Sequence, residues 1–189
     1  MAPLPKYLLW LDFETTGLDP ATTTIVEVFW EVTDTLMDPI AEGRGMHPTP
    51  ELLDMDDFVR GMHATSRLFD DARCHVGHDI EQSLLYLMMV LDDIGEPVPL
   101  AGSGVGHFDR LVLAAQYPKL AAMLCYWSLD TGVLRRAAQL AGYADLLLPD
   151  AEPVHRAEAD VRRAQAEYRN HVCLLSEARF HLSLGGEQP

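Results

Sequence analysis

Two carboxylates, Asp12 and Glu14, end an apolar run near the start of the chain, in the sequence LLWLDFETTGLDP (residues 8–20). If residues 7–14 form a strand, side chains two positions apart share a face, so the two carboxylates point the same way. Like charges held together repel, and a proton or a cation must lie between them. Ligands that are all oxygen suit Mg²⁺ or Mn²⁺. The pair indicates a divalent-cation site, with a solvent-facing strand end as the simpler alternative.

Three further groups fall where they could complete such a site. Asp109 follows the glycine-rich turn GSGVGHFD (residues 102–109) and begins a predicted helix. His155 and Asp160 lie in HRAEADVRRAQ (residues 155–165), at the start of the last predicted helix. Residues about one turn apart on a helix face the same side. One helix terminus can therefore present an imidazole and a carboxylate together.

The elements that must position these groups are predicted from apolar periodicity and turn residues. The predicted strands are residues 7–14, 23–33, 36–46, 97–102 and 125–129, and the predicted helices are residues 51–58, a segment starting near 65–66, 78–94, 109–116, 131–141 and 156–182. The first three strands form an antiparallel meander, because their connections are too short for a helical crossover. The fold class is α/β: a mixed five-stranded sheet, three antiparallel strands first and parallel strands added later, flanked by helices.

Composition indicates one domain over residues 1–189, with residues 184–189 as a flexible tail. Hydrophobic residues make up 48% and charged residues 23% of the 189 positions, as in ordinary soluble proteins. No apolar run approaches the ~20 residues that span a bilayer, so no membrane association is expected. The start of the chain has no secretory signal pattern. Three scattered cysteines predict free thiols and a cytoplasmic location.

The charge balance is strongly acidic, with 29 Asp and Glu against 14 Lys and Arg and a formal net charge of −15. Such a surface repels long polyanions, because nonspecific affinity for nucleic acid comes from neutralising many phosphates. A short nucleic acid held by cations inside a pocket is still compatible with this charge.

The motifs LDFETTGLDP, GHFDRLVL and HRAEAD resemble, in order and spacing, the three motifs of the DEDDh 3′→5′ exonucleases, which have a ribonuclease H-like fold. The closer resemblance is to the oligoribonucleases, and it extends to PELLDMDDFVRGMHATSRL (residues 50–68) and YWSLDTGVLRRAAQL (residues 126–140). The resemblance implies that Asp12, Glu14, Asp109 and Asp160 bind two divalent cations, Mg²⁺ or Mn²⁺, and that His155 is the general base. Two cations about 3.5–4 Å apart suit phosphodiester hydrolysis, and histidine titrates in the range that a base needs.

The same resemblance implies substrate contacts on three segments. The residues concerned are Thr15, Gly17, Leu18, Phe58, His63, Ser66 and Tyr126. Leu18 would be a hydrophobic wedge beside the terminal base, and Phe58 would stack on a base, a contact of roughly 1–3 kcal/mol. Tyr126 would reach across a homodimer interface, and Asp130 would support the site. An ordinary turn residue, loop packing and a core tyrosine are the respective alternatives for Leu18, Phe58 and Tyr126.

The chain departs from the oligoribonuclease pattern in two places. The turn before Asp109 is about one residue longer and lacks the family's asparagine, and Trp127 stands where an arginine would cap the 5′ phosphate of the substrate. Loss of that guanidinium removes a charge-assisted contact. The strict dinucleotide preference of the family is therefore left open here.

The predicted function is a two-metal-dependent 3′→5′ exoribonuclease that degrades short single-stranded oligoribonucleotides to 5′-mononucleotides. One alternative is an exonuclease of the same type that acts on single-stranded DNA or on both nucleic acids. Another is a non-catalytic nucleic-acid-binding module with the same fold. Cys74, His75 and His78 could be taken for a zinc site, but their spacing fits no common pattern. Polar residues exposed before a helix explain that run more simply.

Overall fold

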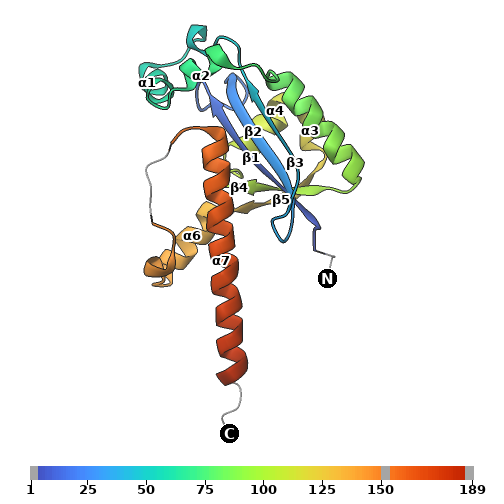
Figure 1. The fold of residues 1–189 in the computed structure, drawn as a ribbon, viewed down its shortest axis with the longest axis vertical. Coiled ribbons are helices and arrows are strands. Elements are labelled where there is room, and N and C mark those ends of the chain that lie inside the picture. Colours follow the sequence, from blue (N-terminus) through green and yellow to red (C-terminus); the bar gives the residue numbers. More distant parts are fainter. Residues whose placement is uncertain (1–3, 150–153, 186–189) are drawn as a thin grey trace.

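The computed structural model describes residues 4–149 and 154–185, which form a mixed five-stranded sheet with helices on both faces (Figure 1). The strands are β1 (Tyr7–Thr15), β2 (Ile25–Asp34), β3 (Pro39–Met46), β4 (Val98–Gly102) and β5 (Leu124–Asp130). The helices are α1 (Asp57–Thr65), α2 (Leu68–Cys74), α3 (Ile80–Ile94), α4 (Asp109–Gln116), α5 (Pro118–Ala121), α6 (Thr131–Leu140) and α7 (Ala157–Gly185), with 3₁₀ turns η1 (Pro50–Leu52) and η2 (Ala144–Leu146). Residues 186–189 of the expected tail lie outside the described residues.

The strand order is β3-β2-β1-β4-β5. β1 pairs antiparallel with β2, and β2 pairs antiparallel with β3, so the predicted meander is confirmed. β4 pairs parallel with β1, and β5 pairs parallel with β4. The long segment between β3 and β4 contains α1 to α3, which is enough chain for the crossover that a parallel pair requires. The strand that carries Asp12 and Glu14 thus lies at the centre of the sheet.

Alternation along β1 decides which face receives the two carboxylates. The odd-numbered side chains from Leu9 to Phe13 pack in the main core with α3 and α4. Leu8 and Trp10 pack on the opposite face with α7. Asp12 and Glu14 continue this even-numbered series and therefore share the face that α7 covers.

The start of α7 is held close to the sheet by small apolar side chains. Ala157, Val161 and Ala164 follow one stripe of the helix, are 0–1% exposed and contact the cluster that contains Trp10. Figure 1 shows α7 crossing this face of the sheet and extending well beyond it. Its first turns therefore lie over β1, whereas its later turns leave the sheet.

The predicted helix over residues 51–58 is wrong. The structure has the short turn η1 there, an extended Leu53, and α1 beginning only at Asp57. Asp56 determines that start, because its side chain accepts a hydrogen bond from the Val59 amide at 2.8 Å and caps the helix. The helix predicted over residues 78–94 is α3, which begins with a capping box in which the Asp79 side chain accepts from the Gln82 amide at 2.8 Å. None of the described helices is long and apolar enough to cross a membrane.

Candidate active site

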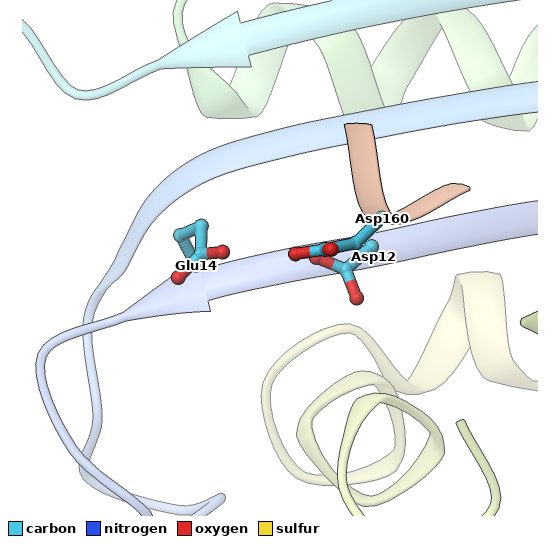
Figure 2. A group of neighbouring side chains, drawn as sticks. All are labelled: Asp12, Glu14 and Asp160. Atoms are coloured by element: carbon cyan, nitrogen blue, oxygen red, sulfur yellow. The ribbon is translucent and has the colours of Figure 1, made fainter. Parts of the chain in front are cut away.

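Three carboxylates converge at the end of β1. Carboxylate oxygens of Asp12, Glu14 and Asp160 all lie within 4.8 Å of one another, and Figure 2 shows Asp160 approaching from α7 above the strand. Strand alternation brings Asp12 and Glu14 to one face, and the packing of α7 brings Asp160 to the same place. In residues 4–149 and 154–185 no other group of three His, Cys, Asp or Glu side chains converges in this way.

Asp109 lies next to this cluster but is not one of its three members. It is the first residue of α4, is 4% exposed, and accepts a hydrogen bond from the Phe13 amide through Oδ1 at 3.1 Å. That bond ties it to β1 between Asp12 and Glu14. The four acidic residues expected from the sequence are therefore neighbours, with Asp109 held by the backbone.

Burial raises the pKa values of all four carboxyl groups, and repulsion from the other members of the set adds to this effect at Asp12 and Glu14. The pKa of Glu14 is raised to about 8, first by burial and then by the charges of Asp160 and Glu27. Burial raises the pKa of Asp109 to about 7, against the two backbone hydrogen bonds that lower it. The pKa values of Asp12 and Asp160 are also raised, in both cases mainly by burial.

These pKa shifts apply to the protein without bound cations. They test whether the four carboxylates fit a divalent cation. A buried group of oxygen ligands that keeps its charge only at high pH has a deficit of positive charge, which a divalent cation would supply. The donors are all carboxylates, which suit hard cations such as Mg²⁺ and Mn²⁺. The residues present therefore fit the expected cations.

His155 lies two residues before the start of α7 and has a left-handed backbone with φ of 54°. It borders a cavity of about 280 Å³ together with Asp12 and Asp160. An imidazole and two of the clustered carboxylates thus face one space, as the sequence predicts. A positive φ is uncommon for a residue other than glycine and persists only where the surroundings impose it.

Sequence reasoning missed part of the wall of this cavity. Ser103, Arg135, Arg163 and Glu167 also line it. Both arginines pair with the buried Glu167, at 3.5 and 3.3 Å. Their position beside the carboxylates depends on how α6 packs against α7, which no local pattern reveals.

A larger cavity of about 780 Å³ opens on the other side of His155 and contains two of the predicted substrate contacts. Phe58 and Ser66 line it together with His155, and the Phe58 side chain is 79% exposed. Leu18, in the turn after β1, is 85% exposed. The exposure of Phe58 argues against simple packing under a loop and leaves the ring free to contact a base. The exposure of Leu18 fits both an ordinary turn residue and a base contact.

Three more of the predicted substrate contacts lie near the end of β1 and differ in exposure: His63, Thr15 and Gly17. His63 has no exposed surface, and its Nε2 lies 2.9 Å from the Thr15 carbonyl oxygen, while Nδ1 lies 3.8 Å from Glu14 Oε2. Thr15 is buried and donates to the Gly17 carbonyl at 2.8 Å. A Cβ at Gly17 would meet no atom within 4 Å. The predicted substrate contact of His63 therefore does not match its position, which is behind Glu14, whereas Gly17 faces open space.

Tyr126 and Asp130 lie on β5, the edge strand of the sheet. Tyr126 is 94% exposed, which excludes the alternative that it belongs to the core. Asp130 Oδ1 accepts from the Gly104 amide at 3.1 Å and from the Val133 amide at 3.2 Å. It thus fixes the glycine-rich turn and caps α6, which is the supporting role expected of it.

The alternative zinc site is not formed. Cys74 is exposed, and His75 Nε2 lies against the backbone carbonyl of His78 at 3.0 Å. These side chains are not among the described groups that could hold a metal. Polar residues before α3 remain the explanation of this run.

Comparisons with known proteins agree on family and fold. A family model described as exonuclease matches residues 9–168. The oligoribonuclease of Corynebacterium diphtheriae is 34% identical over 183 residues, covering 93% of this chain and 87% of that protein. The oligoribonuclease of Azoarcus sp. is 30% identical, covering 90% of this chain and 96% of that protein.

Among solved structures, the metal-free form of an E. coli ExoI–ssDNA complex has a TM-score of 0.64 at 15% identity. The match covers 96% of this chain and 44% of the longer one, so the chain spans less than half the length of that protein. At this identity the likeness concerns the fold alone. It confirms the expected ribonuclease H-like arrangement.

Proposed function

The chain belongs to the exonuclease family, and from this premise we propose that it is a 3′→5′ exoribonuclease that degrades short single-stranded oligoribonucleotides to 5′-mononucleotides. One observation carries the proposal: Asp12, Glu14 and Asp160 converge beside His155, at a cavity that a phosphodiester can enter. The oligoribonucleases of two other organisms align with nearly the whole chain, which favours RNA as the substrate.

Exonuclease-family enzymes use divalent metals, and the acidic cluster fits them. We propose two ions, Mg²⁺ or Mn²⁺, held by Asp12, Glu14, Asp109 and Asp160. When bound, such ions supply positive charge that polarises the scissile phosphate and lowers the pKa of a water molecule. The hydrogen bond from the Phe13 amide holds the Asp109 carboxylate against β1, where its charge acts on Asp12.

His155 provides the general base in this proposal. A neutral imidazole beside the carboxylates accepts a proton from the attacking water as the new bond to phosphorus forms. The bond between phosphorus and the 3′ oxygen of the preceding nucleotide then breaks, and this oxygen takes a proton from solvent water. The products are a 5′-mononucleotide and an RNA one residue shorter with a free 3′ hydroxyl.

Phe58, Ser66 and Leu18 would bind the 3′-terminal nucleotides, with Phe58 stacking on a base at the 780 Å³ cavity. Thr15 and Gly17 shape the adjoining turn, and Gly17 leaves room for the backbone of the substrate to approach. The position of His63 supports a role in holding Glu14. The net charge of −15 favours short substrates, because affinity must come from the cavity and not from a basic surface.

Three further parts of the proposal concern the whole protein. We propose that residues 1–189 form one exonuclease domain that acts as a homodimer, with the exposed Tyr126 reaching the partner's site. The cysteines Cys74, Cys125 and Cys173 are free thiols, which supports a cytoplasmic location.

A product ladder tests the reaction directly. RNA labelled at its 5′ end, in lengths from 2 to 24 nucleotides, is incubated with protein and Mg²⁺ or Mn²⁺, and matched DNA is run beside it. Stepwise shortening from the 3′ end of short RNA is expected, with DNA cleaved more slowly. Equal rates on RNA and DNA would contradict the ribonuclease specificity.

The same assay distinguishes an enzyme from a binding module. Asp12→Ala should abolish hydrolysis because it removes a ligand from the centre of the cluster, while circular dichroism stays that of a folded protein. Binding of short RNA without hydrolysis by the wild-type protein, in either metal, would instead identify a non-catalytic module.

A further inference from the structure

A buried glutamate on β2, Glu27, lies below the carboxylate cluster and was not expected from the sequence to contribute to the site. It is 0% exposed, and its backbone pairs with that of Glu14 across the β1–β2 ladder. A buried carboxylate must be neutralised or fully hydrogen-bonded to be tolerated. The groups that donate hydrogen bonds to Glu27 therefore show which part of the site this carboxylate stabilises.

Glu27 accepts four hydrogen bonds, three of them from arginine. Arg44 Nη2 donates to Oε1 at 2.6 Å. Arg156 donates from Nη2 to Oε1 at 3.1 Å and from Nε to Oε2 at 3.0 Å, a two-pronged contact that fixes the guanidinium in one orientation. The fourth donor is the Ala157 amide, at 3.2 Å from Oε2.

Two of these partners, Arg156 and Ala157, lie at the start of α7. Ala157 is the first residue of α7, so the Glu27 carboxylate occupies the place of an N-cap and lies at the positive end of the helix. The Asp160 amide then donates to the Arg156 carbonyl at 3.0 Å, which starts the helix one turn before the metal-binding position. Asp160 is thus placed by a helix start that Glu27 determines.

Arg156 also joins the catalytic end of α7 to the wall of the substrate cavity. Its Nη1 donates to Asp71 Oδ2 at 2.5 Å and to the Ser66 carbonyl at 3.3 Å. His155 precedes it directly and has the unfavourable φ of 54°. A clamp on the next residue is a sufficient cause for that backbone conformation, since strain of this kind persists only where neighbours impose it.

We propose that Glu27 and Arg156 are positioning residues for the reaction: the ion pair between the buried Glu27 and the partly buried Arg156 holds His155 and Asp160 against the carboxylates of β1. This inference rests on the proposed function for its kinetic consequence. A displacement of about 1 Å in a catalytic group costs on the order of 10²-fold in rate. Loosening the pair should therefore lower kcat by about that factor with little change in KM, because the exposed base-binding residues are not moved.

The chain contains a matched control six residues further along α7. Arg162 pairs through Nη1 with Glu31 Oε2 at 2.7 Å, and Glu31 is 5% exposed on the same strand and the same face as Glu27. Glu31→Gln removes a buried charge between β2 and α7 just as Glu27→Gln does, but away from the start of the helix. Both variants should lose thermal stability, whereas only Glu27→Gln should lose turnover.

The experiment compares Glu27→Gln, Arg156→Lys and Glu31→Gln with the wild-type chain at temperatures where each is folded. Arg156→Lys keeps the charge but cannot make the two-pronged contact, and it serves if Glu27→Gln folds poorly. kcat and KM are measured on a short RNA with Mg²⁺. Separately, the ring Cε1–H signal of His155 is recorded by NMR without metal and identified with His155→Asn.

The expected result is a kcat about 10²-fold lower and a displaced or broadened His155 signal in Glu27→Gln and Arg156→Lys, with neither effect in Glu31→Gln. Equal kcat values in Glu27→Gln and Glu31→Gln would overturn the proposal. If the wild-type protein hydrolyses nothing, the proposed function fails, but the NMR signal still decides. An unchanged His155 signal in Glu27→Gln would then overturn the positioning role.

Discussion

At the scale of single residues, the defining feature is a set of carboxyl groups whose surroundings oppose their ionisation. Asp12, Glu14 and Asp160 are held within 4.8 Å of one another by two unrelated elements, and burial raises the pKa of each. A protein that only needed a stable fold would gain by replacing them with apolar or neutral side chains. Their presence together is explained by a cation that uses their charge.

Glu14 gives this feature a measurable pH dependence. Its pKa is about 8 in the folded chain, against an ordinary value of 4.5, so the folded state binds this proton more tightly than the unfolded chain does. Its contribution to stability is therefore fully present below about pH 4.5 and is lost as the pH rises through 8. In EDTA, Tm of the wild-type protein should fall over this range more steeply than Tm of Glu14→Gln.

Differential scanning calorimetry checks this expectation. The excess fall should reach several degrees, since each kcal/mol corresponds to ~2–4 °C in a chain of this size. Added Mg²⁺ should raise Tm of the wild-type protein most at high pH, where the carboxylates are ionised. Parallel Tm curves for the wild type and Glu14→Gln in EDTA would contradict the assigned shift.

His155 is expected to control the pH dependence of the reaction. His155→Ala should lower kcat by about 10²–10⁴-fold, the usual contribution of a general base. The rising limb of the pH–rate profile should disappear with it, because the variant has no imidazole to accept a proton from the attacking water. Mn²⁺ affinity, measured by titration calorimetry, should stay close to that of the wild type. A profile that keeps its limb in His155→Ala would assign the base to another group.

At the scale of elements, local patterns predicted what local interactions determine. The alternation of β1 correctly placed Asp12 and Glu14 on one face, and the helix predicted over residues 78–94 is present as α3, which Asp79 and Gln82 cap. The start of α1 was missed because the helix predicted over residues 51–58 combines the 3₁₀ turn η1 with the first residues of α1, whereas Asp56 caps α1 as a separate helix. Turn and capping preferences alone do not decide between two neighbouring positions at which a helix could begin.

Long-range packing accounts for what the sequence could not supply. No pattern in the chain indicates that α7 lies over β1, and the joining of His155 and Asp160 to the site came from family resemblance. Glu27 is the clearest omission. An acidic residue inside an otherwise apolar strand was a usable signal, because such a group must find a buried partner, but only the structure identifies Arg156 as that partner.

We expect the segment from α1 to α2 to contribute to substrate affinity through Phe58. Phe58→Ala should raise KM for a trinucleotide RNA by about 5- to 150-fold, which corresponds to 1–3 kcal/mol of base stacking. kcat should change little, and Tm should stay constant because the ring is 79% exposed. Leu52→Ala is the control, since Leu52 is 78% exposed on η1 and does not line the cavity. Equal KM values for the two variants would remove Phe58 from the substrate site.

At the scale of the whole molecule, the open edge of the sheet bears on assembly. Tyr126 projects from β5 with 94% of its surface exposed, so it makes little contact within its own chain. If it completes the site of a partner protomer, two defective variants should complement each other. Asp12→Ala supplies an intact Tyr126, and Tyr126→Ala supplies an intact catalytic cluster.

Mixing these two variants under conditions that allow subunit exchange should restore activity well above that of either one alone. Light scattering on the same samples should give the mass of a dimer. The double variant, carrying both substitutions on one chain and mixed with itself, is the inactive control. Activity in the mixture no greater than the sum of the separate variants would show that Tyr126 acts within its own chain or not at all.

Because the surface is acidic, we expect salt to favour the cleavage of long RNA over short RNA, which is the opposite of its effect on most nucleic-acid-binding proteins. A formal charge of −15 repels the part of a long RNA that extends beyond the cavity, and this repulsion is screened as salt increases, since the Debye length falls from ~30 Å at 0.01 M to ~8 Å at 0.15 M. The ratio of kcat/KM for a 24-nucleotide RNA to that for a trinucleotide should therefore rise with KCl at constant Mg²⁺.

A protein that binds RNA along a basic groove shows a falling ratio, because salt weakens each phosphate contact. Ladders of the two RNAs, recorded in 10 and 150 mM KCl, separate these cases, and a falling ratio would point to a groove for long RNA that the charge of this chain argues against.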